Sequence, residues 1–180
     1  MNALLSSLLP ACLFVAAGMA WAGKAHQHGV AQLDVVVDPA RVTLELETPL
    51  DNLVGFERAP RTDAERAAVD KALARLREAD KLFRIDSVAG CALDKVTLAS
   101  AVLGLGAAPG ATAAQNKGEH AELNARFEFI CKTGQRAGFV EVELFEAFAQ
   151  MKRINLQLVL PRGQMKATLV RPATRVALVR

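Results

Sequence analysis

Residues 32–47 read QLDVVVDPARVTLELE, and this stretch decides the fold. On either side of Asp38-Pro39-Ala40, apolar side chains recur at every second position. Because successive side chains of a strand point to opposite faces of a sheet, this period predicts two strands that each bury one face. Asp and Pro favour turns, so the stretch predicts a β-hairpin. The side chains expected on its buried face are Leu33, Val35, Val37, Val42, Leu44 and Leu46.

One amphipathic helix is expected after the hairpin. Thr62-Asp63-Ala64-Glu65 has the pattern of a capping box, in which Thr and Glu each accept a hydrogen bond from a backbone N–H of the helix start. Apolar residues then recur at helical spacing, which predicts a helix from residue 62 to about residue 80. The charged residues lie mostly off this apolar stripe and are expected to face solvent. The stripe consists of Val69, Ala72, Leu73, Leu76, Ala79 and Phe83.

Further strands are expected on both sides of a linker. Residues 91–98 are typical of a strand, and residues 104–118 are rich in Gly and Ala, as flexible linkers are. Alternation resumes after the linker and predicts a second hairpin from residues 123–129 and 140–144. A short helical turn is expected within residues 144–151. The last strands are expected at 154–160, 164–170 and 175–179, with a turn at Pro161-Arg162-Gly163.

These elements predict an α+β protein of two β-rich lobes with mainly antiparallel strands and one clear amphipathic helix at about 62–80. The N-terminal lobe is expected to span residues 23–103 and the C-terminal lobe residues 119–180, with the linker 104–118 between them. A single compact unit is the default for a chain of this length. Both halves place a histidine before a strand, a turn and a second strand, which leaves a weak internal duplication open.

The first 22 residues predict export from the cytoplasm. Residues 4–19 are almost wholly apolar or small and carry no charge, and Ala20-Trp21-Ala22 places small residues where a signal peptidase cleaves. Cleavage after Ala22 gives a periplasmic protein. A permanent membrane anchor is the alternative, but it needs about 20 apolar residues and this stretch is shorter. Lipidation at Cys12 is a weaker alternative because that cysteine comes too early.

Cys91 and Cys131 form a pair once the signal peptide, with Cys12, is removed. Thiols oxidise in the periplasm, so the pair is expected to form a disulfide. The alternative is a reactive thiol or a metal–thiolate pair. Neither cysteine has a neighbouring histidine or a second cysteine at C-x-x-C spacing, which argues against that alternative.

Composition and motifs argue against two broad classes of function. The net charge of +3 comes from Lys and Arg residues interleaved with acidic ones, which is typical of a solvated surface and not of a nucleic-acid site. The chain has no Tyr, and its one Trp is in the predicted signal peptide, so aromatic platforms for bases are scarce. It also contains no H-E-x-x-H motif, activated nucleophile or phosphate-binding glycine loop. No nucleic-acid partner is expected, and the protein is not expected to be an enzyme.

Three histidines are candidate metal ligands. His26-Gln27-His28 precedes the first strand, where a spacing of two puts both imidazoles on the same side of an extended chain. His120, next to a glutamate, opens the second half. Neutral imidazole binds Zn²⁺ well, so a zinc site combining His26, His28 and His120 with a carboxylate is one hypothesis. The alternative is that all three are polar residues at mobile strand entries. Processing after Gly23 would instead allow Lys24-Ala25-His26 to bind Cu²⁺ or Ni²⁺.

The chain resembles the ZrgA-like periplasmic proteins, a family first described as a domain of unknown function. The resemblance rests on His26-Gln27-His28-Gly29, on Asn52-Leu53-Val54-Gly55-Phe56-Glu57-Arg58-Ala59-Pro60, on Gly90-Cys91, and on the order of the elements up to residues 157–163. It implies a zinc-responsive, zinc-binding periplasmic protein that assists metal uptake, beside an inner-membrane transporter. The two histidines of the first motif, His120 and the two cysteines carry over.

Two departures from this family bear on function. Such proteins often have a His-, Asp- and Glu-rich stretch between the halves, whereas residues 104–118 contain no histidine and no carboxylate. They also often have His where this chain has Arg58, and a cation cannot ligate a metal. The rival hypothesis is therefore a structural or partner-binding envelope module that has lost metal binding. Without the resemblance, residues 50–60 are expected to be a loop with a tight turn at Gly55 and with Phe56 packed into the core.

Overall fold

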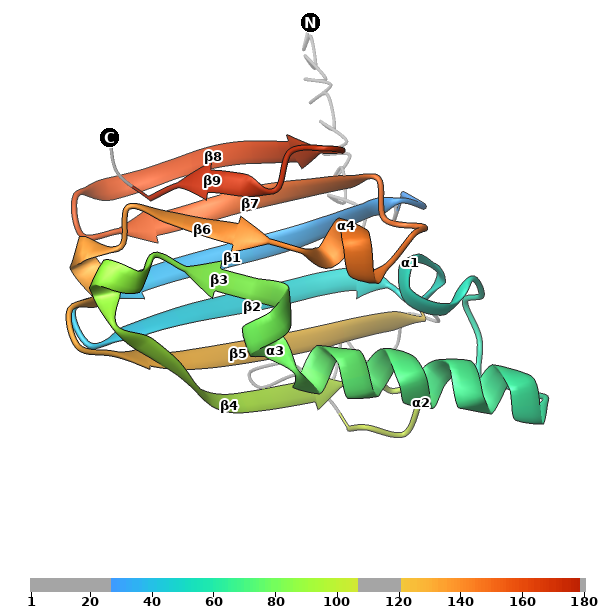
Figure 1. The fold of residues 1–180 in the computed structure, drawn as a ribbon. Helices are drawn as coiled ribbons and strands as arrows, with labels where there is room; N and C mark the ends of the chain where they lie inside the picture. Colours follow the sequence, from blue (N-terminus) through green and yellow to red (C-terminus); the bar gives the residue numbers. More distant parts are fainter. Residues whose placement is uncertain (1–26, 107–120, 179–180) are drawn as a thin grey trace, which may run out of the picture.

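The computed structural model describes residues 27–106 and 121–178 (Figure 1). The predicted signal peptide, Cys12 and most of the predicted linker lie outside this part of the chain. Within it, no helix is long and apolar enough to cross a membrane. The elements, with η for a 3₁₀ helix, are β1 Val30–Asp38, β2 Arg41–Pro49, α1 Asp51–Val54, α2 Asp63–Arg77, α3 Ala79–Leu82, β3 Phe83–Ile85, η1 Ser87–Ala89, β4 Cys91–Ala99, β5 Glu122–Cys131, η3 Gly134–Arg136, β6 Phe139–Val142, α4 Leu144–Ala147, β7 Arg153–Leu160, β8 Gly163–Val170 and β9 Arg175–Ala177.

The predicted hairpin is the centre of a six-stranded sheet with the order β4-β5-β2-β1-β7-β8. β1 and β2 pair antiparallel, with Asp38 opposite Arg41 at the turn. β5 pairs antiparallel with the outer edge of β2, whereas β7 pairs parallel with the outer edge of β1. Strands from residues 23–103 and from residues 119–180 therefore lie in the same sheet, and the two segments predicted as lobes share it.

A second layer covers one face of this sheet. It contains the three-stranded sheet β3-β6-β9, the long helix α2, and the short helices α3 and α4, all in front of the large sheet in Figure 1. The buried apolar residues of both layers form one continuous cluster. Phe83 of β3 and Phe127 of β5 join the layers, with ring centroids 4.9 Å apart. The core therefore lies between the large sheet and the second layer.

The α+β class with mainly antiparallel strands and one long helix is confirmed. The hairpin buries the six side chains expected from its alternation. Helix α2 begins after Thr62, whose side chain accepts a hydrogen bond from the backbone N–H of Glu65, and the reciprocal bond of the capping box is present. The helix ends three residues earlier than expected, because Glu78 leaves the helical conformation before α3 begins.

The second predicted hairpin is wrong. Residues 122–131 form β5 of the large sheet, whereas residues 139–142 form β6 of the small sheet. β5 pairs with β2 on one side and with β4 on the other, so it has no free edge for β6. Both alternating stretches form strands as predicted, except that β6 ends at Val142 and Leu144 belongs to α4, but the halves do not repeat one arrangement. The proposed internal duplication therefore finds no support in the pairing.

A disulfide joins Cys91 at the start of β4 to Cys131 at the end of β5. The two residues are directly opposite each other in the antiparallel register of these strands. β4 is an edge strand, and several of its residues are exposed. The disulfide therefore ties this edge strand to the interior of the sheet.

Asn52 joins the beginning of β1 to the end of β2. Its side chain is fully buried in α1, where Oδ1 accepts a hydrogen bond of 2.6 Å from the Gly29 N–H. Its Nδ2 donates to the Val30 carbonyl at 2.9 Å and to the Thr48 hydroxyl at 3.0 Å. One carboxamide thus bonds groups from two segments, the start of β1 and the end of β2, that are separated in sequence.

Removing the disulfide should destabilise the protein. The cross-link joins residues 40 positions apart and so restricts the unfolded chain. Without it the unfolded chain gains entropy, which lowers the free energy of unfolding by about 4 kcal/mol. We expect that loss in urea unfolding of a Cys91→Ala/Cys131→Ala variant. Reduction of the unaltered protein should lower its stability by a similar amount. Two reactive sulfhydryls in the unfolded, unreduced protein would contradict the disulfide.

Asn52→Ala should also destabilise the protein, by about 3 kcal/mol, because the three hydrogen bonds of this buried side chain are lost at about 1 kcal/mol each. The free energy of unfolding measured in urea tests this. Asn155→Ala is a matched control, since Asn155 is half-buried on the solvent face of β7. An equal loss in both variants would show that the contacts of Asn52 add nothing specific.

Candidate functional site

Of the three predicted ligands, the described part of the chain includes only His28; His26 and His120 lie outside it. His28 lies in a turn from Gln27 to Val30, closed by a hydrogen bond of 3.0 Å from the Val30 N–H to the Gln27 carbonyl. The expectation of an extended chain is therefore wrong at His28, and the argument from a spacing of two does not apply there.

Gly29 allows this turn and attaches it to β7. Its φ of +80° lies in the left-handed region that L side chains rarely adopt. A Cβ at this position would lie 3.2 Å from Cδ of Lys152 and 3.4 Å from the carbonyl oxygen of Gln150. The Gly29 carbonyl accepts hydrogen bonds from the N–H groups of Lys152 and Arg153. The backbone of the residue next to His28 is therefore held firmly.

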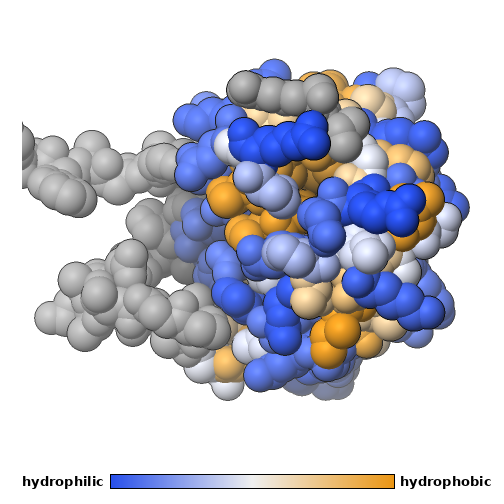
Figure 2. Space-filling view, turned by 90° about the vertical axis from the view of Figure 1, so that its left-hand side faces the viewer, coloured by the Kyte–Doolittle hydropathy of each residue, from blue (hydrophilic) through white to orange (hydrophobic). Residues whose placement is uncertain are grey.

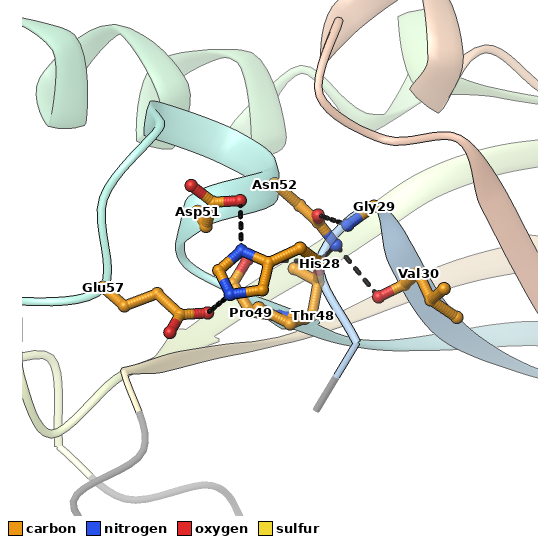
Figure 3. Close-up of polar contacts among 8 residues, drawn as sticks. All are labelled: His28, Gly29, Val30, Thr48, Pro49, Asp51, Asn52 and Glu57. Carbon is orange, nitrogen blue, oxygen red and sulfur yellow. Dashed lines mark hydrogen bonds and ion pairs between the residues drawn. The ribbon is translucent and has the colours of Figure 1, made fainter. Parts of the chain in front are cut away.

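Residues 50–60, expected as a loop, contain the short helix α1. Gly55 ends this helix with φ +84°, and its N–H donates to the Asp51 carbonyl at 2.8 Å. This left-handed residue permits the tight turn that was expected there. The chain then turns back, so Asp51 and Glu57 approach His28 from two sides (Figure 3).

Both ring nitrogens of His28 face carboxylates (Figure 3). Nδ1 donates to Oδ2 of Asp51 at 2.8 Å, and Nε2 lies 3.8 Å from Oε1 of Glu57. The His28 side chain is 68 % exposed, whereas those of Asp51 and Glu57 are 23 % and 39 % exposed. The hydrogen bond to Asp51 and the charges of Glu57 and Asp51 raise the pKa of His28 above its usual 6.5.

The spacing of His28 and Glu57 is close to what a shared metal ion requires. With Zn–N and Zn–O distances of about 2.0–2.2 Å and tetrahedral angles, the two ligand atoms would be about 3.4 Å apart. The observed 3.8 Å needs only a small adjustment of exposed side chains. However, the described residues contain no group of three His, Cys, Asp or Glu side chains placed to hold a metal. A metal ion at this pair would need further ligands from outside the described residues.

The second described segment begins beside this site. Ala121 directly follows His120, and its carbonyl accepts a hydrogen bond of 2.7 Å from the Leu50 N–H. Leu50 in turn directly precedes Asp51. The backbone on the C-terminal side of His120 is thus bonded to the backbone that carries the partner of His28.

Arg58 has a structural role. Its guanidinium donates two hydrogen bonds to the Glu65 carboxylate, at 2.9 and 2.6 Å, and lies 5.1 Å from the centroid of the Phe56 ring. With the bonds from the backbone N–H groups of Arg61 and Thr62, this lowers the pKa of Glu65 to about 2. Arg58 therefore joins the chain after α1 to the start of α2.

Sequence reasoning missed Asp51, Asn52 and Glu57. A carboxylate was expected to join the histidines, but neither Asp51 nor Glu57 was identified. A signal was present, because both carboxylates flank or belong to the short motif from Asn52 to Pro60. The structure brings this motif into contact with His28-Gly29, so two of the motifs that carry the family resemblance form one site.

Comparison with known protein families agrees with that resemblance. Residues 25–178 match the family described as ZrgA family zinc uptake protein. No curated protein matches the chain. The match covers most of the chain and includes His28 and both of its carboxylate partners. The chain therefore belongs to the ZrgA family of zinc uptake proteins.

Proposed function

We propose that this protein is a periplasmic zinc-binding accessory protein that assists zinc uptake by an inner-membrane transporter. Membership of a zinc uptake family supports the metal and the process. The placement of His28 between Asp51 and Glu57 is the observation that carries the proposal, because it offers a metal-binding nitrogen beside a carboxylate.

Asp51 fixes the tautomer of His28 that can bind zinc. A carboxylate can only accept a hydrogen bond, so it holds the proton on Nδ1 and leaves the lone pair of Nε2 free for a metal. Such carboxylate–histidine pairs commonly orient zinc ligands in proteins. Glu57 is the second proposed ligand, since Oε1 is its atom nearest to Nε2.

His26 and His120 are the proposed additional ligands. His26 precedes His28 by two residues, and His120 precedes Ala121, whose carbonyl is bonded to Leu50. Zinc usually takes four ligands, so His26 and His120, or one of them and a water molecule, complete the set with His28 and Glu57.

The composition favours transfer of zinc over storage. His28 and Glu57 are exposed, and the stretch of residues 104–118 has no histidine or carboxylate to capture zinc in bulk. An accessible site of low capacity suits a protein that passes single ions to a partner. The exchange of ligands needed for such transfer is easier at an exposed site than in a closed structural one.

The rival proposal is an envelope module that binds a partner without metal. One observation favours it: the described residues contain no group of three potential ligands suited to a metal. In that case the contacts of His28 only stabilise the turn before β1. Zinc affinity distinguishes the two proposals.

Zinc titration calorimetry should detect binding, and His28→Ala should weaken it at least about tenfold because a ligand is lost. Asp51→Asn, which keeps the size of the side chain but not its charge, should weaken binding by about 10- to 100-fold, the usual effect of a group that orients a zinc ligand. Glu57→Gln should also weaken binding. Glu146→Gln, at an exposed glutamate of α4, is the matched control.

The zinc proposal at His28 would be contradicted by a dissociation constant above about 10 μM for the unaltered protein. Equal affinities for all these variants would also contradict it. If His26→Ala or His120→Ala abolished binding while His28→Ala and Glu57→Gln did not weaken it, the protein would still have a zinc site. That site would not include the pair of His28 and Glu57. The same calorimetry decides between these outcomes.

The zinc-free protein should show a His28 titration midpoint above 6.5, because Asp51 and Glu57 stabilise the imidazolium. Asp51→Asn should bring the midpoint back toward 6.5. NMR titration measures this, and His28→Ala assigns the resonance. Stabilisation by the charged pair is full below pH 6.5 and is lost as pH rises through the raised folded-state pKa. A midpoint at or below 6.5 in the unaltered protein would contradict the contacts described.

A further inference from the structure

The charges of this chain are segregated at its C-terminal end. All 19 Asp and Glu residues and 15 of the 22 Lys and Arg residues lie at or before Glu146. Residues 147–178 contain six Lys and Arg residues and no acidic residue. The interleaving of charges expected from composition therefore ends where β7, β8 and β9 begin.

Five of these six cations have no acidic partner among the described residues, but one of the five, Arg171, is bonded to backbone carbonyls. Arg171 donates to the carbonyls of Met151 and Phe148, at 3.1 and 3.2 Å, and Arg175 pairs with Glu141. The other four are exposed, and no ion pair of the described residues includes them. We call these four residues the basic edge: Lys152, Arg153, Arg162 and Lys166.

The basic edge runs along the rim of the large sheet. β8 is the last strand of that sheet, at the top in Figure 1. Arg153 begins β7, Lys166 lies midway along β8, and Arg162 lies in the turn between these strands. Strands of eight residues are about 26 Å long, so the cations are spread over that length. They do not converge on a single small anion.

Apolar groups accompany the cations. Val170, directly opposite Arg153 in the strand register, is 48 % exposed. At the other end, a hollow of about 260 Å³ lies beside Arg162, and its lining combines Leu160, Met165 and Leu178 with Gln135 and Gln164. Figure 2 views this end of the molecule and shows apolar side chains at the surface between polar ones.

We propose that the basic edge binds the surface of an anionic phospholipid bilayer. The cations supply charge complementarity to a flat array of phosphates, and the hollow beside Arg162 and the exposed Val170 can contact the apolar part of a lipid. Each Lys or Arg near such a surface strengthens binding about fivefold. An acidic protein or a second copy of the chain would match the charge, but neither requires an apolar hollow beside a cation.

Bilayer binding would place the candidate site close to the membrane. The Gly29 carbonyl accepts hydrogen bonds from the N–H groups of Lys152 and Arg153, so His28 is a near neighbour of the basic edge. A bilayer at this edge would hold His28 beside a transporter in the same membrane. This consequence rests on the proposed zinc function, whereas binding to the bilayer does not.

Flotation with lipid vesicles, without added zinc, tests the proposal. The protein is used without residues 1–22, because that apolar segment would bind any vesicle, and the described fold begins only at residue 27. It should bind phosphatidylcholine vesicles that contain phosphatidylglycerol, but not phosphatidylcholine alone. Arg153→Glu/Lys166→Glu should weaken binding at least about 20-fold. Raising the salt from about 0.1 to about 0.5 M should also weaken it, since ions screen exposed charges.

Lys71→Glu/Arg77→Glu is the matched control, because it makes the same change of charge on exposed residues of α2. It should bind vesicles like the unaltered protein, and circular dichroism should show that both variants are folded. The proposal would be overturned if both double variants lost vesicle binding equally. It would also be overturned if the protein bound both kinds of vesicle equally, or bound neither at low salt. Self-association in sedimentation velocity that depends on Arg153 and Lys166 without vesicle binding would overturn it as well. Zinc calorimetry is a separate measurement, so the two proposals can fail independently.

Discussion

The structure depends on pairing both outer edges of the β1–β2 hairpin. A hairpin alone exposes two rows of unpaired backbone groups and one apolar face, so it is at best marginally stable in water. Here β5 covers the edge of β2 and β7 covers the edge of β1, while the second layer covers the apolar face. Both covering strands come from the C-terminal half. The hairpin therefore joins the two halves into one sheet and one core.

The same pairing creates the candidate site. In an antiparallel hairpin the beginning of the first strand and the end of the second lie at the same end, and here Gln32 is opposite Glu47. The turn that carries His28 therefore meets α1, which follows β2 directly. Asn52 holds the two segments together through buried hydrogen bonds, and Asp51 and Glu57 then contact an imidazole on the surface. A rigid, buried support below exposed polar groups is the arrangement that a ligand site needs.

Acidic and basic residues are distributed unevenly along the chain, because all acidic residues lie at or before Glu146. Acidic residues take part in structural contacts, such as Glu65 with Arg58 and Glu141 with Arg175. The acid-free C-terminal segment instead supplies β7 and β8, which form one edge of the sheet. The four cations of the basic edge are exposed and have no ion pair within the described part of the chain. Because β7 also pairs with β1, this edge and the surroundings of His28 share the same backbone hydrogen bonds. The two proposed functions of the molecule, zinc binding and membrane contact, thus lie on adjoining strands.

The sequence by itself determined the strands of residues 32–47, the helix that starts after Thr62, and the family, because alternation, capping and short motifs are patterns among near neighbours. It also indicated the pairing of Cys91 with Cys131, since only two cysteines remain after the predicted signal peptide. Only the tertiary structure decided that β5 and β6 belong to different sheets, that β1 and β7 are parallel, and that Asp51 and Glu57 meet His28. Alternation shows which side chains of a strand are buried but not which strand pairs with it. Contacts between distant segments depend on that pairing, and it is settled by the competition of all strands for the free edges of one sheet.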